Sequence, residues 1–202
     1  MTLALIDYGA GNLHSVHNAL KAAGAVGVVV TADPHVVAKA DRIVLPGVGA
    51  FAHCMGALAA IDGMVDAMDQ RVRGGGIPFL GICVGMQLLA DAGVEHGTTQ
   101  GLGWIGGTVR AIPPAAGLKI PHMGWNDVAP TGNGLLEQGE AYYLHGYHFD
   151  AADAADVLAT TDHGGSLLAA IGRDNIIGVQ FHPEKSQAYG TDFLKRFLKW
   201  VP

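Results

Sequence analysis

Short, nearly continuous apolar runs recur through the first ninety residues of the chain. Four of them read as buried strands, at 3–9 ("LALIDYG"), 26–31 ("VGVVVT"), 42–47 ("RIVLPG") and 77–82 ("IPFLGI"). Between the first two, residues 13–23 repeat their apolar positions at helical spacing. Strands without polar alternation, separated by helices, predict a parallel sheet covered on both faces.

Two further helices are expected around the fourth run. Residues 51–73 have a helical pattern that Gly56 and Gly63 weaken. The segment 84–92 ("VGMQLLADA") follows the fourth run directly and also reads as a helix. The chain therefore passes from strand to helix within a few residues at positions 81–85.

The second half of the chain has a different pattern. Strands follow one another with turns between them, at 101–112, 141–150, 157–164, 167–174 and 176–183. An amphipathic helix closes the chain at 191–201. We predict an α/β fold: a single domain over 1–202 whose central, mostly parallel sheet is flanked by helices and has a mixed or antiparallel extension in its C-terminal half.

Composition narrows the functional class. The 202 residues carry a net charge of −6 and two cysteines, Cys54 and Cys83. An acidic balance gives no support for nucleic-acid binding, and no apolar run approaches the ~18 residues of a membrane span. The N-terminus lacks the basic region of a signal peptide, so we expect a cytoplasmic protein with reduced thiols.

Cys83 lies at the predicted strand-to-helix junction, in the sequence "GICVG". This is the pattern of a nucleophile elbow, with cysteine in place of serine. Gly81 and Gly85 would make room for a strained turn that presents the thiol, and the backbone N–H of Val84 would face a developing oxyanion. The alternative is a small cysteine packed in the core, and this pattern alone does not separate the two.

A candidate base lies ninety-nine positions later, in "VQFHPEKS". In an extended segment His182 and Glu184 project to the same side, so the carboxylate could orient the imidazole for the thiol. A chance pair is the alternative, since the chain has ten histidines. The occurrence of both motifs next to strands of one sheet favours catalysis.

The loop "LPGVGAF" at 45–51 could complete an oxyanion hole. Two glycines after a strand would leave the N–H groups of Val48 and Gly49 free to face a carbonyl oxygen. An ordinary turn is the alternative, and a phosphate loop is excluded because no G-K-[ST] follows.

Together these motifs resemble the class I (triad) glutamine amidotransferases. "IDYGAGNLHSV" at 6–16 and "PHMGWN" at 121–126 extend the likeness over nearly the whole chain. Within that family, the set is similar to the glutaminase subunits of imidazole glycerol phosphate synthase, which serve histidine biosynthesis.

The resemblance implies a glutaminase without a metal or another cofactor. Cys83, His182 and Glu184 match the catalytic positions, and the N–H groups of Val84 and of the Val48–Gly49 turn would hold the oxyanion. The implied glutamine-binding residues are Gln87, Glu95, Gly49, His145, Gly146 and Tyr147. Gly146 replaces the serine usual in the family, which puts one substrate contact in doubt.

The resemblance also implies a partner. A separate (β/α)8 synthase subunit would receive ammonia through an internal tunnel, forming a heterodimer. Asn12, Trp125 and Lys185 match interface positions; Trp125, in a loop flanked by proline and glycine, could equally cover the core.

Three other functions stay open at this point. The chain could be a cysteine hydrolase acting alone, a glutaminase for another pathway such as vitamin B6 or purine synthesis, or a catalytically silent regulatory module. The intact Cys83, His182 and Glu184 argue against the last.

Overall fold

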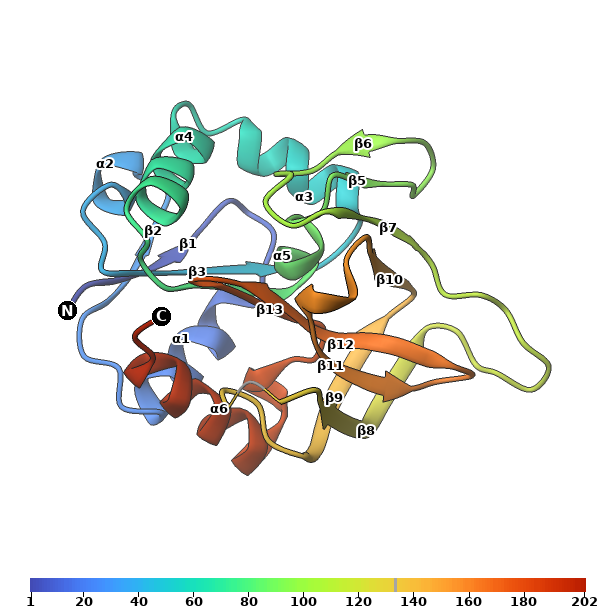
Figure 1. The fold of residues 1–202 in the computed structure, drawn as a ribbon. Coiled ribbons are helices and arrows are strands. Elements are labelled where there is room, and N and C mark those ends of the chain that lie inside the picture. Colours follow the sequence, from blue (N-terminus) through green and yellow to red (C-terminus); the bar gives the residue numbers. More distant parts are fainter. Residues whose placement is uncertain (133) are drawn as a thin grey trace.

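A nine-stranded sheet forms the core of the protein, described by a computed structural model for residues 1–132 and 134–202 (Figure 1). Five adjacent strands are parallel: β2 (Val28–Thr31), β1 (Leu3–Ile6), β3 (Arg42–Gly47), β4 (Phe79–Cys83) and β13 (Ile176–Val179). The sheet continues with four antiparallel strands: β12 (Ser166–Arg173), β11 (Val157–Asp162), β8 (His122–Pro130) and β9 (Gly139–His145). The predicted α/β class, with an antiparallel extension in the second half, is confirmed.

Helices cover both faces of the parallel part (Figure 1). α2 (Pro34–Val37), α3 (Phe51–Ala59) and α4 (Met64–Asp69) lie on one face, and α1 (Leu13–Ala22) and α6 (Gln187–Lys199) lie on the other. Every residue of β1, β3, β4 and β13 is buried, which explains why these strands lack polar alternation. None of the helices in the described residues is long and apolar enough to cross a membrane.

Two predicted helices differ from the structure. The segment 51–73 is divided at Gly63, whose φ of +73° breaks the helix before α4, and it ends in the turn Gln70–Gly74. The helix expected over 84–92 is the short α5 (Val84–Gln87). The chain then turns into β5 (Ala92–Gly93), because this segment joins a second sheet.

A four-stranded sheet accounts for most of the other differences. Its order is β10 (Tyr147–Ala151), β7 (Gly107–Ala111), β5 and β6 (Thr99–Gln100). The single strand expected over 141–150 is interrupted at Gly146, where the chain leaves β9 of the large sheet and enters β10 of the small one. Residues 145–147 therefore lie at the junction of the two sheets.

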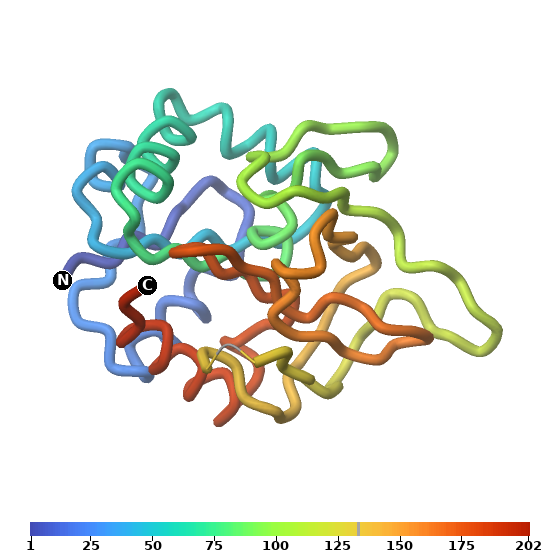
Figure 2. The backbone as a smooth tube through the Cα atoms, in the orientation of Figure 1, coloured from blue at the N-terminus to red at the C-terminus, as the bar shows by residue number. Residues whose placement is uncertain are grey.

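The segment 113–130 was not predicted as structured. Figure 2 shows residues after β7 reaching outward as a long loop before the chain returns along β8. Trp125 lies on β8 and pairs with Tyr142 of β9, so its placement in a loop was wrong.

The parallel strands place several loops at one edge of the large sheet. β1, β3, β4 and β13 run in the same direction, so the segments that follow Ile6, Gly47, Cys83 and Val179 meet there. Binding sites of open α/β sheets form at this edge.

Candidate active site

Cys83 ends β4 in a conformation that few non-glycine residues adopt. Its φ is 54° and its ψ is −114°, a strained elbow between β4 and α5. A Cβ on Gly81 would lie 2.6 Å from the Gly85 carbonyl oxygen, and one on Gly85 would strike the Leu45 carbonyl oxygen. The two glycines are therefore required by the close approach of α5 to β4 and β3.

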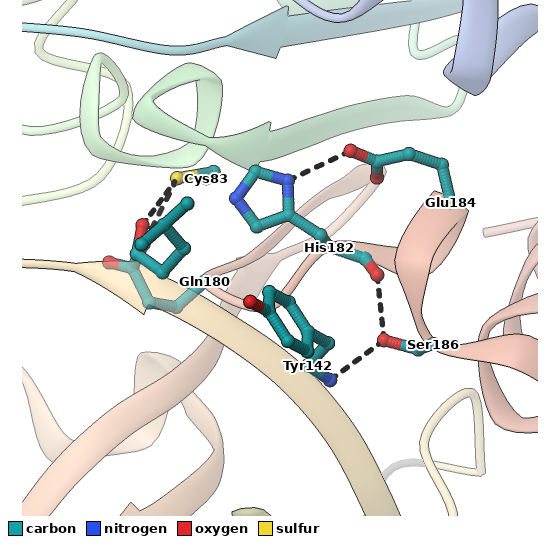
Figure 3. A network of polar contacts seen from close by, with 7 residues as sticks. Cys83, Tyr142, Gln180, His182, Glu184 and Ser186 are labelled. Carbon is teal, nitrogen blue, oxygen red and sulfur yellow. Dashed lines mark hydrogen bonds and ion pairs between the residues drawn. The ribbon is translucent and has the colours of Figure 1, made fainter. Parts of the chain in front are cut away.

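His182 follows β13 at the same edge of the sheet. Its Nδ1 lies 2.8 Å from Oε1 of Glu184, and the two side chains are 3% and 2% exposed. Figure 3 shows the ring between Glu184 and the Cys83 thiol. The expected extended path through Glu184 was wrong, because Pro183–Lys185 form a 3-10 turn; this turn still directs the carboxylate onto the ring.

The surroundings of His182 favour its protonated form. Burial opposes charge on the ring, but hydrogen bonds with Cys83 and Glu184 outweigh it and raise the pKa of His182 to about 10. At neutral pH the ring is therefore an imidazolium beside the thiol. A cationic ring beside the sulfur is the arrangement that activates a cysteine nucleophile.

Ser186 fixes the backbone that carries His182. Its Oγ donates to the His182 carbonyl oxygen at 2.6 Å and accepts from the Tyr142 N–H at 2.9 Å (Figure 3). The His182 N–H in turn donates to the Tyr142 carbonyl oxygen. Sequence analysis missed this residue, although it ends the "HPEKS" motif.

A cavity of about 310 Å³ opens onto Cys83. It brings together most of the residues that the sequence placed at the site: Val48, Gly49, Cys83, Val84, Gln87, Glu95, His145, Gly146, Tyr147, His182 and Lys185. Pro121 and Leu144 also line it and were not predicted. Glu184 lies behind His182, as an orienting group should.

The predicted oxyanion donors come from two segments that line this cavity, the loop after β3 and the start of α5. The Cys54 thiol donates to the Val48 carbonyl oxygen at 3.3 Å, so the Gly49 N–H, on the other side of the same planar peptide, points away from Cys54. Val84 begins α5, and the first N–H groups of a helix have no partner within it. The N–H groups of Val48, Gly49 and Val84 remain predictions as oxyanion donors.

Two buried histidines support the wall formed by residues 145–147. The Nδ1–H of His145 donates to the Tyr147 carbonyl oxygen at 2.9 Å, which leaves its Nε2 to accept from Nδ1 of His122 at 3.1 Å. Burial lowers the pKa values of His145 and His122, to about 3 and about 4. Both rings are therefore neutral at physiological pH, and their tautomers are fixed.

The three predicted interface residues occupy different places. Lys185 lines the cavity, and its Nζ lies 5.8 Å from the centre of the Tyr142 ring. Trp125 lies outside the cavity, half-exposed, with its ring edge-on to the same tyrosine. Asn12 precedes α1 in the loop that follows β1, whose Gly11 packs against Pro46.

Comparison with protein families shows which family the chain belongs to. The model of the class-I glutamine amidotransferases matches residues 4–200. The chain belongs to this family. The recognition made from sequence motifs is thereby confirmed.

The relatives of this amidotransferase show which members of the family it is similar to in sequence. It is 61% identical to the imidazole glycerol phosphate synthase subunit HisH of Zymomonas mobilis, covering 100% of this chain and 97% of the relative. It is 55% identical to the subunit of the same name from Rhodospirillum rubrum, with both chains fully covered. Among solved structures, a glutamine amidotransferase has a TM-score of 0.77 at 20% identity, covering 98% of both chains, which supports the fold.

The Glu184→Gln variant tests the role of the carboxylate in the amidotransferase. Because Glu184 raises the pKa of His182, its loss should lower that pKa and move the alkaline limit of glutaminase activity to lower pH. We expect kcat to fall by about 100-fold or more, as for an orienting group of a triad. A pH–rate profile against the unmodified protein measures both effects; an unchanged profile would contradict the role.

Proposed function

We propose that this chain is the glutaminase subunit of an imidazole glycerol phosphate synthase in histidine biosynthesis. The observation that carries the proposal is the buried Cys83–His182–Glu184 arrangement, in a chain 61% identical to HisH. The names of the relatives favour this pathway over vitamin B6 or purine synthesis.

The first half of the reaction forms a thioester. The Cys83 thiolate attacks the side-chain amide carbon of glutamine, and the N–H groups of Val84 and Gly49 hold the resulting oxyanion. His182 gives its proton to the amide nitrogen as the C–N bond breaks, and ammonia leaves.

The second half returns the thiolate. His182, now neutral, takes a proton from water, and the resulting hydroxide attacks the thioester carbon. The C–S bond then breaks with its electron pair remaining on sulfur, releasing glutamate. Glu184 keeps the ring oriented and stabilises its positive form in both halves.

Substrate selection depends on the far end of the cavity. Glu95 accepts the Phe51 N–H at 2.9 Å through one carboxylate oxygen, so its position is fixed while it lines the cavity. Both Nε2 hydrogens of Gln87 are used inside the protein, which leaves its Oε1 to accept from the α-ammonium of glutamine. At Gly146 the substrate meets backbone alone.

An exposed apolar strip at the mouth of the cavity is evidence for a docking surface that a synthase subunit would cover. Ile120, Met123 and Trp125 are 41%, 63% and 47% exposed, next to Pro121 of the cavity wall. Tyr142 contacts both Trp125 and Lys185, so the strip and the cavity are continuous. We place the (β/α)8 synthase subunit over this strip, where ammonia would pass directly to it.

A glutaminase assay tests the proposal. We expect low activity from the chain alone and strong stimulation when the (β/α)8 synthase and its nucleotide ligand are added. Full activity without the synthase would contradict a coupled subunit, and no activity in the complex would contradict the glutaminase itself.

Trp125→Ala tests the interface. Loss of a large aromatic anchor should weaken synthase binding by about 10- to 100-fold, measured by titration calorimetry. Val26→Ala is the matched control. Val26 is 82% exposed and lies two residues before β2, the edge strand of the large sheet, away from the cavity. Equal affinities for the two variants would place the interface elsewhere.

A further inference from the structure

Gln180 is a fully buried polar residue whose side chain reaches the nucleophile. Its Nε2 lies 3.6 Å from Sγ of Cys83, and its side chain is 0% exposed. It follows β13, two residues before His182. In Figure 3, Gln180 and His182 approach the sulfur from different sides. Sequence analysis quoted the "VQFHPEKS" segment and gave this residue no role.

Gln87 fixes which end of the Gln180 amide faces the sulfur. The Tyr147 carbonyl oxygen is only an acceptor, so the Gln87 atom 3.0 Å away must be its NH₂ group. That NH₂ group also lies 2.9 Å from Gln180, which must therefore present its oxygen to Gln87. The Gln180 NH₂ group is left facing Cys83.

A donor at this place favours the ionised nucleophile. The Leu144 carbonyl oxygen also lies near the sulfur, at 3.9 Å, and a carbonyl can only accept, which favours the protonated thiol. The N–H of Gln180 has the opposite effect, because a thiolate is a far better acceptor than a thiol. α5 has only four residues, so its macrodipole contributes less at the sulfur than that of a long helix.

We propose that Gln180 is a catalytic residue that stabilises the Cys83 thiolate by a hydrogen bond, with Gln87 holding its amide in the donating orientation. This inference deepens the proposed glutaminase function and rests on it. The donor contributes before attack, when it raises the fraction of thiolate. It contributes again when the thioester breaks down, because the C–S electron pair returns to a sulfur that already faces an N–H.

Other titratable groups surround the sulfur and bear on any pH measurement. They come from the segment after β13, from α3, from the loop after β1 and from the cavity wall: His182, Glu184, Cys54, Tyr8, Glu95, His145 and Lys185. None of them is altered by changing Gln180, so a shift between variants reports the lost donor.

Alkylation of Cys83 by iodoacetamide across a pH series tests the proposal on the purified chain. Mass spectrometry of the peptide that contains Cys83 separates its reaction from that of Cys54. In Gln180→Leu we expect the midpoint of the alkylation profile to rise by about one pH unit, the size of a lost charge-assisted hydrogen bond. Gln87→Leu should raise it by a smaller amount, because the Gln180 amide is then free to turn.

Asn175→Leu is the matched control. Asn175 is an amide whose Nδ2 donates to the Val72 and Ile77 carbonyl oxygens, at the edge of the sheet opposite Cys83. Its loss should lower the thermal midpoint of unfolding and leave the alkylation midpoint unchanged. If Gln180→Leu does not fold, Gln180→Met has the same chain length without an N–H and replaces it.

The outcomes separate this inference from the proposed function. An unchanged alkylation midpoint in a folded Gln180 variant would overturn the role of Gln180, and an unchanged midpoint in Gln87→Leu would overturn the orienting step. The midpoint could rise in the Gln180 variant while the unmodified protein, together with its synthase, fails to hydrolyse glutamine. That result would support Gln180 as a donor to the thiolate and would contradict the proposed glutaminase function. With turnover intact, the acidic limit of the kcat pH profile should move to higher pH together with the alkylation midpoint.

Discussion

Cys83→Ala is expected to abolish glutamine-dependent synthesis in the complex with the synthase subunit. Among the described residues that line the cavity, Cys83 is the only cysteine, and no other nucleophile is paired with His182. We therefore expect the rate of glutamine-dependent synthesis to fall by about 10⁴-fold or more. The variant should still fold, because alanine fits where a small buried residue stood and only the sulfur is removed. Product formation with glutamine as nitrogen source measures the loss.

Added ammonium salts provide the control for Cys83→Ala. If the subunit serves only to release ammonia, synthesis from ammonium should proceed at the unmodified rate. Loss of both activities would show that Cys83 is needed for the structure of the complex and would contradict its role as nucleophile.

Gly85→Ala is expected to destabilise the protein strongly. An added Cβ would overlap the Leu45 carbonyl oxygen and lie 2.8 Å from its carbonyl carbon, both in the backbone of buried β3. β3 is buried and paired with β1 and β4 on its two sides, so we expect the free energy of unfolding to fall by about 3 kcal/mol or more. Urea denaturation measures the change.

Gly56→Ala is the matched control for Gly85→Ala. Gly56 lies within α3, and a Cβ there would have no neighbour within 4 Å. Alanine is the better helix former by about 1 kcal/mol, so this variant should be as stable as the unmodified protein or more so. Similar losses in both variants would contradict the explanation by close backbone approach.

Sequence patterns predicted the parallel half of the fold well. β1, β3 and β4 are buried on both faces, so their apolar runs are nearly continuous and easily recognised. Gly63 marked a weak point of the helical pattern in 51–73, whereas the early end of α5 depends on contacts elsewhere in the chain. Helical periodicity in 84–92 was overridden because Ala92–Gly93 pair with β6 and β7.

The candidate site could be predicted where chemistry has a local signature. Cys83 stands out by its flanking glycines, and His182 by its neighbouring Glu184. Gln180 and Ser186 carry no such signature, since their roles come from atoms brought close by folding. The prediction that Trp125 lies in a loop was wrong because β8 pairs with β9. No local sequence pattern indicates this contact between the two segments.

The Tyr147 carbonyl oxygen accepts hydrogen bonds from both Gln87 and His145. Every amino acid supplies a main-chain carbonyl, so substitutions at position 147 leave this acceptor in place. The orientation of the Gln180 amide at the Cys83 sulfur therefore does not depend on the side chain at position 147. It depends on having glutamine at both 87 and 180. In a set of related sequences, positions 87 and 180 should change together, while position 147 drifts freely with respect to them.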